Sequence, residues 1–290
     1  MELSLLLPAV ISGLASGAVY ALIALGLTLI YGVLHIINFA HGSLLMLALY
    51  AAFFLWTLLG IDPYIAILVL VPAFFVLGYL LQRFVVAPAS HGRDENVLMV
   101  TLGLSIVIDN LALYFFSSTT RTIDVPYAGD AVNLGVMYLP VPRLIAFAAA
   151  LVLAGLLWLL ITRTDLGRAI RAVAREADGA RLVGIRVEHI YAVTFGIGTA
   201  CVAAAACLLL PSFYVTPQVG YAFVLVAFTT VVLGGMGSFP GAVLAGFLLG
   251  VVESVGGLYL GQSLGQFGIY LAFILVLLFR PTGLFGARTA

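Results

Sequence analysis

Residues 162–189 read TRTDLGRAIRAVAREADGARLVGIRVEH and form a charged island in an otherwise apolar chain. The island carries half of the twelve arginines, namely Arg163, Arg168, Arg171, Arg175, Arg181 and Arg186. A charged segment between long apolar runs stays on one side of a membrane, and arginine favours the cytoplasmic side. We therefore interpret residues 163–189 as a cytoplasmic loop.

The middle of this loop, residues 166–180, has the composition of a short helix. At 100° per residue its arginines and its small apolar residues separate onto two faces, with Arg168, Arg171 and Arg175 on one and Ala169, Ala172 and Val173 mostly on the other. Gly179 and Gly184 can end such a helix. Membrane anchoring alone requires neither this length nor a helix bounded by glycines, so the pattern favours a docking helix for a soluble partner.

The composition excludes several classes of protein. The chain is 64% hydrophobic and 8% charged, with a mean hydropathy of +1.23, which predicts an all-α integral membrane protein. A net charge of zero argues against a nucleic-acid partner. The chain contains no lysine, which excludes a P-loop and a lysine Schiff base. Cys201 and Cys207 suggest two buried small residues, without a metal, cofactor or disulfide.

Apolar runs long enough to span a membrane predict a polytopic bundle of about eight to nine transmembrane helices in a single domain, residues 1–290. The runs are 8–31, 36–57, 63–86, 95–117, 143–162, 190–211, 217–235, 240–260 and 264–280. If the loop 163–189 is cytoplasmic, ten arginines fall inside and only Arg121 and Arg143 outside. The N-terminus is then outside and the C-terminus cytoplasmic. Whether 36–57 crosses fully or is partly re-entrant stays open.

The outer loop, residues 117–142, is rich in proline and glycine. Its alternating piece Val132 to Tyr138 favours a small hairpin or a segment lying flat on the surface. A loop of this length is either a plain connector or a contact surface for an extracellular or periplasmic partner.

Two stretches interrupt the apolar pattern, YGVLHIINFAHGS at 31–43 and GGMGSFPGA at 234–242. They echo each other weakly, which is typical of transporters built from two related halves with interrupted helices. If the first stretch is helical, its three polar residues share one face, and in the second Ser238 can cap a helix that has Pro240 in its first turn. We hypothesise a substrate path lined by His35, Asn38, His41, Gly234, Gly235, Gly237 and Ser238. The alternative is polar packing and a tight corner.

Other features within the apolar runs are less specific. Asp109 and Glu253 are acids inside predicted spans and hence candidate functional groups, although hydrogen bonding between helices also accounts for them. Small residues at four-residue spacing predict close helix packing or dimerisation, as in Gly13/Gly17, Gly246/Gly250, Gly257/Gly261 and Gly261/Gly265.

Three motifs together resemble a known family, the permease subunits of branched-chain amino acid ABC importers of the LivH type. The early signature is YGVLHIINFAHGS (31–43), the loop is AREADGARLVGIRVEH (174–189), and the C-terminal half contributes VLGGMGSFPGAVLAG (232–246) and RPTGLFG (280–286). The resemblance covers nearly the whole chain. It is less specific for the solute, because similar motifs occur in permeases for urea, amides and other small polar solutes.

The resemblance implies a bacterial inner-membrane protein that pairs with a second, homologous permease subunit, two cytoplasmic ATP-binding subunits and a periplasmic solute-binding protein. Whether the second permease is a homologue or another copy stays open. The loop would insert into a groove of the ATPase, through Arg175, Asp178, Ala180, Leu182, Gly184 and Ile185. The expected function is alternating-access import of branched-chain amino acids or a related small polar solute. The alternative is an ion-coupled secondary transporter, and a channel or scaffold is a third reading.

Overall fold

The computed structural model describes residues 2–90, 94–133, 138–279 and 283–285. Within these ranges the chain is almost wholly helical. The elements are α1 (Glu2–Leu34), α2 (His41–Leu59), α3 (Pro63–Leu81), a π-helical turn η1 (Gln82–Val86), α4 (Ala87–Ser90), α5 (Asp94–Phe116), β1 (Ala131–Asn133), β2 (Tyr138–Pro140), α6 (Val141–Arg163), α7 (Asp165–Arg175), α8 (Ala177–Leu182), α9 (Val187–Leu209), α10 (Val219–Gly234), α11 (Phe239–Leu260) and α12 (Gln262–Phe279).

Nine of these helices correspond to the nine apolar runs of the sequence. Seven have the length and hydropathy of membrane spans, and two shorter apolar helices, Val219–Gly234 and Leu264–Phe279, complete the set in the described ranges. At 1.5 Å per residue a 23-residue helix such as α6 or α9 is about 35 Å long, enough to cross the roughly 30 Å hydrocarbon layer. The prediction of an all-α polytopic membrane protein is therefore confirmed.

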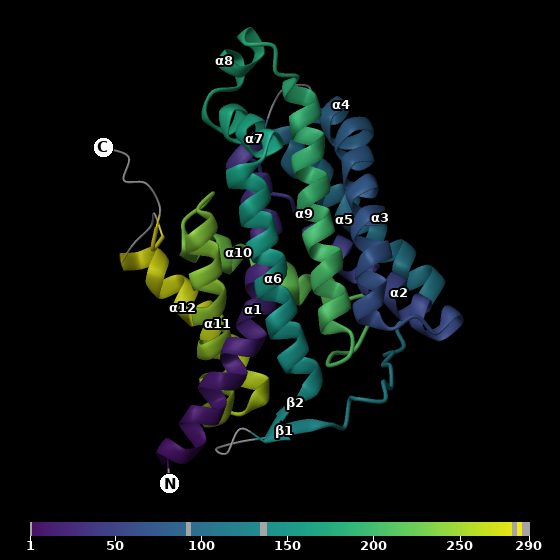
Figure 1. The fold of residues 1–290 in the computed structure, drawn as a ribbon, viewed down its shortest axis with the longest axis vertical. Helices are drawn as coiled ribbons and strands as arrows, with labels where there is room; N and C mark the ends of the chain where they lie inside the picture. Colours follow the sequence, from purple (N-terminus) through teal and green to yellow (C-terminus); the bar gives the residue numbers. More distant parts are fainter. Residues whose placement is uncertain (1, 91–93, 134–137, 280–282, 286–290) are drawn as a thin grey trace.

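The bundle has two distinct ends (Figure 1). One end, called here the loop end, carries α7 and α8, while the other, called the hairpin end, carries β1, β2 and the start of α1. The hairpin pairs Ala131 with Pro140 and Asn133 with Tyr138, which confirms the hairpin predicted within the loop 117–142.

The loop that precedes the hairpin is tied to α3. Tyr127 donates a hydrogen bond of 2.7 Å to Asp62, whose carboxylate also accepts from the backbone N–H of Tyr64 at 2.9 Å and so caps α3. Burial, and then the hydrogen bond to this carboxylate, raise the pKa of Tyr127.

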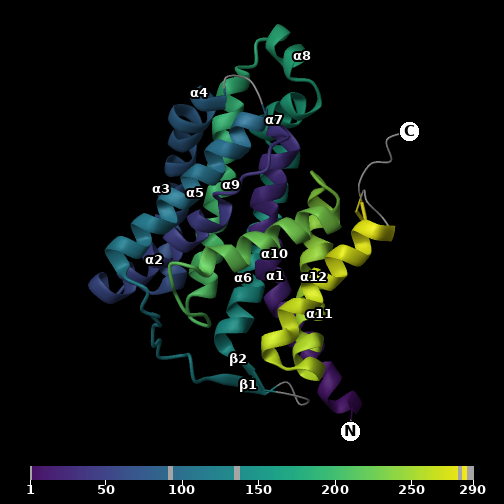
Figure 2. The same cartoon turned by 180° about the vertical axis from the view of Figure 1, so that it is seen from behind.

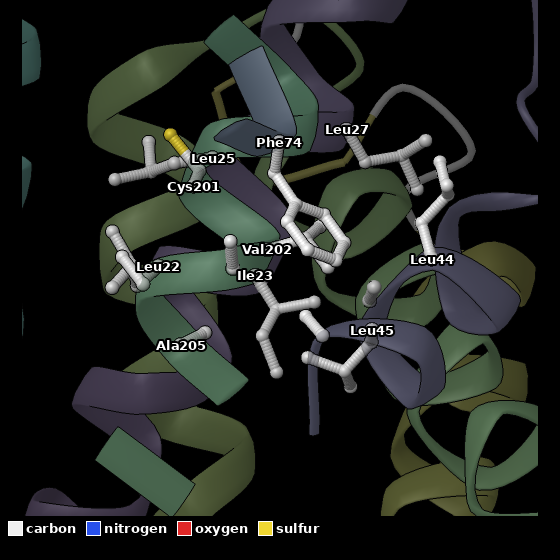
Figure 3. Close-up of a cluster of buried hydrophobic side chains, with 14 of the residues drawn as sticks. Leu22, Ile23, Leu25, Leu27, Leu44, Leu45, Phe74, Cys201, Val202 and Ala205 are labelled. Carbon is white, nitrogen blue, oxygen red and sulfur yellow. The ribbon is translucent and has the colours of Figure 1, made fainter. Parts of the chain in front are cut away.

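Helices α1 and α9 form the centre of the bundle. In their most apolar windows 78% and 94% of residues are buried, against 17 to 28% in α3, α5, α6 and α11. The core around them is largely aliphatic (Figure 3), with Ile23 of α1 near Leu45 of α2 and Val202 of α9, and with Leu22 on the side of Cys201 and Ala205. The outer faces of the peripheral helices are apolar and exposed, as lipid contact requires.

Glycines allow the central helices to touch through their backbones. A Cβ built on Gly26 would lie 2.6 Å from the carbonyl oxygen of Gly198, and the reverse distance is 2.8 Å. The same holds between the starts of α2 and α10, where the distances for Gly42 and Gly220 are 2.3 and 2.6 Å. Any side chain at these positions would overlap backbone atoms, so the helices pack at the closest possible separation.

Contacts around this centre follow a two-fold pattern. Helix α1 packs along α11, where Gly13 meets Gly250 and Gly17 meets Gly246, and α9 packs along α3 in the same way, where Gly196 and Thr199 meet Gly78. Because α1 runs toward the loop end and α9 away from it, α1–α2–α3 corresponds to α9–α10–α11 with inverted direction. Figure 2 shows α10 lying obliquely across the middle of the bundle. Inverted repeats of this kind occur in many transporters.

The two-fold pattern agrees with the hypothesis of two related halves but matches them differently from the sequence echo. The sequence echo paired residues 31–43 with 234–242. In the structure the link 35–40 after α1 corresponds instead to 210–218 after α9, and the turn 235–238 corresponds to 60–62. The echo arose because both stretches are glycine-containing links, whereas the true correspondence depends on contacts between helices far apart in the sequence.

Candidate functional site

The first interruption is a non-helical segment inside the bundle. Helix α1 ends at Leu34, His35 takes a φ of +56°, and α2 begins only at His41. The predicted helical face shared by His35, Asn38 and His41 is therefore wrong, and the run 36–57 is an irregular segment followed by a helix. His35 is exposed, whereas Asn38 and His41 are fully buried.

Buried side chains satisfy part of this irregular backbone. The side-chain oxygen of Asn38 accepts a hydrogen bond of 3.1 Å from the backbone N–H of Ala40. Nε2 of His41 lies 3.0 Å from the carbonyl oxygen of Ile23, in the middle of α1. A carbonyl only accepts, so His41 donates from Nε2 and its tautomer is thereby defined. Asn38 Nδ2 and His41 Nδ1 are buried without a partner in the described parts of the chain.

Helix α5 attaches to this segment through a row of polar side chains at four-residue spacing. Thr101 lies within hydrogen-bond distance of the backbone of Ile37 and Phe39, at 3.5 and 3.4 Å. Ser105 pairs with Ser43 at 2.9 Å and donates to Asp109 at 3.4 Å. The sequence analysis singled out only Asp109 of this row. The repeat Thr-x₃-Ser-x₃-Asp within an apolar run was the signal that could have identified it.

The second interruption is a tight turn at the loop end. Helix α10 ends at Gly234, and Gly235 and Gly237 take φ values of +96° and +84°. Ser238 caps α11 by accepting a hydrogen bond of 3.3 Å from Gly241, with proline in the first turn, as predicted.

The turn also binds the chain's C-terminal segment. The backbone N–H groups of Leu284 and Phe285 donate to the carbonyls of Leu233 and Gly234 at 2.8 and 3.2 Å. The motif RPTGLFG thus lies against this turn in its described part, residues 283–285.

The two interruptions meet through glycine. A Cβ on Gly32, near the end of α1, would lie 3.3 Å from the Cα of Gly237. The polar side chains Asn38 and His41 bond elsewhere, Asn38 to Ala40 of its own segment and His41 to Ile23 of α1. The predicted path residues therefore belong to two segments that meet through their backbones. Their side chains do not form one ring.

The charged loop 163–189 folds into two short helices instead of the single predicted helix. Thr164 caps α7 by accepting a hydrogen bond of 3.0 Å from Gly167, and α7 ends at Arg175 because Glu176 is extended, with φ −158° and ψ 98°. Ile170 and Val173 are buried against the bundle. The arginines point outward, as the two-face pattern predicted, with Arg168 paired to Asp165 and Arg171 donating to the carbonyl of Ile161.

Helix α8 projects beyond the rest of the bundle (Figure 1). Gly179 lies within it, and the positive φ of Gly184, +87°, ends it. The sequence predicted that Ala180 contacts a partner. Ala180 is only 5% exposed and packs inside the chain, so it is not available for that contact. By contrast Leu182 and Val183 are 89% and 76% exposed. We call Leu182, Val183 and Gly184 the α8 tip.

Ion pairs hold the α8 tip in position. Arg181 contacts Asp178 at 3.0 Å and Glu188, in the first turn of α9, at 2.9 Å. The hydrogen bond from Arg181 to Glu188 and the charge of that carboxylate raise the pKa of Arg181. Because α9 is the most buried helix, this pair connects the tip to the centre of the bundle.

Comparisons with known proteins agree with this architecture. Residues 9–279 match the family model described as branched-chain amino acid transport system / permease component. The chain is 38% identical to the high-affinity branched-chain amino acid transport system permease protein BraD of Pseudomonas aeruginosa, over 95% of this chain and 94% of BraD. It is 32% identical to LivH of Escherichia coli (strain K12), with the same coverage. These matches confirm the resemblance seen in the sequence.

Among solved structures, one chain of PsaBC from Streptococcus pneumoniae in complex with Fab has a TM-score of 0.48 at 14% identity, covering 94% of this chain and 92% of that one.

Proposed function

We propose that this chain, which belongs to the branched-chain amino acid transport permease family, is the membrane subunit of an ATP-driven importer of branched-chain amino acids. As a member of that family the chain is a transport component and not an enzyme. The importer would contain two cytoplasmic ATP-binding subunits, a homologous second permease and a periplasmic solute-binding protein, in the bacterial inner membrane.

The observation that carries this proposal is the exposed α8 tip. Two large apolar side chains are exposed at the loop end, 89% for Leu182 and 76% for Val183, in a segment rich in arginine. Exposed apolar surface of this kind marks a contact with another protein. The chain has no lysine and hence no P-loop, so the energy for active import must come from another chain or from an ion gradient, and the α8 tip offers a contact for another chain.

The arginine distribution supports the orientation. In the described ranges Arg83, Arg163, Arg168, Arg171, Arg175, Arg181 and Arg186 lie toward the loop end, and Arg121 and Arg143 toward the hairpin end. The positive-inside rule then makes the loop end cytoplasmic, with the hairpin and the N-terminus outside. The ATP-binding subunits would dock on α8 and the solute-binding protein on the hairpin end.

The two interruptions are the elements that we expect to move during transport. Irregular backbone within a membrane is tolerated only where protein or a water-filled cavity satisfies it. In the proposed cycle, movement of the α8 tip is passed through Arg181 and Glu188 to α9, and from there to α1 through Gly198 and Gly26. The contact between Gly32 and Gly237 would open and close at the cytoplasmic mouth, and the turn glycines would absorb the change in backbone angles.

The alternative function, an ion-coupled carrier, is favoured by one observation. Glu253 lies within α11 and accepts a hydrogen bond of 2.7 Å from Tyr20, and Asp109 has one buried oxygen without a partner in the described ranges. Intramembrane acids of this kind bind protons or sodium in secondary transporters. Such a carrier would need no ATPase and no exposed α8 tip.

Reconstitution separates the two functions. The chain is co-expressed with its candidate partner subunits, purified in mild detergent and placed in liposomes with labelled leucine and the solute-binding protein. We expect a P-loop ATPase to co-purify and leucine uptake to require ATP hydrolysis. Uptake by the isolated chain under a proton or sodium gradient, without ATP, would contradict the proposal. ATP-driven uptake of urea or an amide in preference to leucine would correct the solute alone.

A further inference from the structure

A cavity of about 740 Å³ lies toward the hairpin end, on the opposite side of the bundle centre from the α8 tip. Its walls come from α1, α6, the end of α9, α10, α11 and α12. Its volume lies within the roughly 300–1,000 Å³ of small-molecule sites in proteins. None of the seven predicted path residues lines it, so it is separate from the two interruptions.

Two opposite charges line the cavity. Glu253 accepts a hydrogen bond of 2.7 Å from Tyr20, and Arg143 donates one of 2.6 Å to Ser12. Their partners Tyr20 and Ser12 both belong to α1, about two turns apart, and both line the cavity. The two charges therefore face the same cavity along one wall helix.

Each of the two charged groups can form more hydrogen bonds than the one described. A carboxylate has about four acceptor positions and a guanidinium five donors, and Glu253 and Arg143 do not pair with each other within 4.0 Å in the described chain. A carboxylate at this depth is costly unless it is paired. An ammonium group held between the two charges would pair with Glu253 and leave Arg143 for a carboxylate.

The remaining walls combine apolar side chains with serines. The apolar ones include Val19 of α1, Leu208 of α9, Phe213 in the link to α10, Phe223 of α10 and Leu258 of α11, and the serines are Ser12, Ser16, Ser212 and Ser254. A pocket with a few polar groups that fix orientation and an apolar remainder is the usual form of a specific small-molecule site.

We propose that this cavity is a substrate subsite for an α-amino acid with an aliphatic side chain. The ammonium group binds Glu253, the carboxylate binds Arg143, and the side chain contacts the apolar wall. An α-amino acid carries both an ammonium group and a carboxylate, which matches the two opposite charges that line this cavity. The inference rests on the proposed function and deepens it, because it assigns the solute chemistry to particular residues.

Protection of an introduced cysteine tests the subsite directly. Ser16 lines the cavity, so Ser16→Cys is made in a background in which Cys201 and Cys207 are replaced by alanine. The full complex is purified, and the rate of modification by a charged methanethiosulfonate is measured with increasing leucine. We expect leucine to slow the reaction saturably. We expect 4-methylpentanoate, which lacks the ammonium, and 3-methylbutylamine, which lacks the carboxylate, to protect at least about tenfold more weakly.

Two matched variants separate ligand binding from structural support. Glu253→Gln keeps the shape and an acceptor for Tyr20 but removes the charge, and we expect it to abolish protection by leucine when each variant's rate is compared with its own rate without leucine. Tyr20→Phe removes the hydrogen bond but keeps the carboxylate, and we expect protection to remain. Equal loss in both variants, or unaltered protection in Glu253→Gln, would overturn the assignment.

Uptake by the unmodified complex, measured in parallel, separates failure of the subsite from failure of the proposed function. ATP-driven leucine uptake without protection would overturn the subsite alone. Protection without ATP-driven uptake would support the subsite and contradict the proposed function. Absence of both would overturn both.

Discussion

At the centre of the bundle a Cβ on Gly42 would lie 2.3 Å from the carbonyl oxygen of Gly220, whereas at the α8 tip a Cβ on Gly184 would meet nothing within 4 Å. Gly42 is therefore required by packing, and Gly184 by its backbone angle of +87°. The residues at the centre are buried by other parts of this chain, whereas at the tip Leu182 and Val183 are exposed. The difference suggests that central residues determine whether the chain folds, and tip residues whether it works with a partner.

The largest effect is expected at the centre. Gly42→Val places three carbons where the backbone of α10 lies, and overlap with backbone rather than with a flexible side chain should cost more than about 3 kcal/mol. We expect almost no monodisperse protein by size-exclusion chromatography of the detergent extract. Gly103→Ala is the control, because Gly103 also lies in a helix but has open space around it. A stable, monodisperse Gly42→Val protein would refute the role of this contact.

The next effect is expected at the turn between α10 and α11. Gly237 has a φ of +84°, and a β-branched residue there costs about 1–3 kcal/mol. A Cβ at this position would be 3.4 Å from Gly32, an ordinary contact, so backbone strain rather than a clash is the cause. We expect Gly237→Val to assemble but to reduce leucine uptake roughly tenfold.

Gly237→Asn is the matched variant, because asparagine tolerates positive φ better than valine. We expect it to retain more uptake than Gly237→Val. Equal uptake in the two variants would show that the backbone angle at this turn has no part in transport.

A smaller effect is expected at the first interruption. Asn38→Leu removes the acceptor for the N–H of Ala40, and an unsatisfied buried group costs about 1–3 kcal/mol. We expect this cost to lower the thermal stability of the complex without preventing its assembly. Because Asn38 lies in a segment that we expect to move during transport, we also expect uptake to fall several-fold. Asn110→Leu is the control, because Asn110 is exposed on α5 and bonds only to its own helix. Normal uptake by Asn38→Leu at normal expression would remove Asn38 from the proposed path.

The smallest effect on stability is expected at the ion pairs below the tip. Arg181 is exposed, and exposed ion pairs contribute little to folding. Arg181→Gln should leave the melting temperature of the complex nearly unchanged. It should nevertheless weaken the stimulation of ATP hydrolysis, because the pair with Glu188 connects the tip to α9. A large fall in melting temperature would instead make Arg181 a folding residue.

The sequence was sufficient for those features that depend on local composition. Nine apolar runs predicted nine apolar helices, and Ser238 with its proline predicted the start of α11. It was insufficient where long-range contacts override a local pattern. Residues 35–40 look helical, but the bond between His41 and Ile23 in α1 holds an irregular segment there. The helix breaks at Glu176, where no glycine or proline predicts a break.

The candidate site was only partly accessible from the sequence for the same reason. Ala180 was expected to contact a partner, but it is buried because α8 packs against α7 and the start of α9. Thr101, Ser105 and Asp109 carried a readable four-residue spacing, whereas Arg143 and Glu253 lie 110 residues apart and share a cavity only in the folded chain.

The most direct test of the account is the number of leucine molecules transported per ATP hydrolysed by the reconstituted complex. Leu182→Glu alters only the tip, with Leu182→Met as the control and Gly184→Glu as a second, more strained variant. The account predicts an unchanged amount of folded permease in all variants and a ratio that falls roughly tenfold or more with either glutamate. A normal ratio and normal stimulated hydrolysis in both glutamate variants would contradict it, because the loop would then be only a membrane anchor.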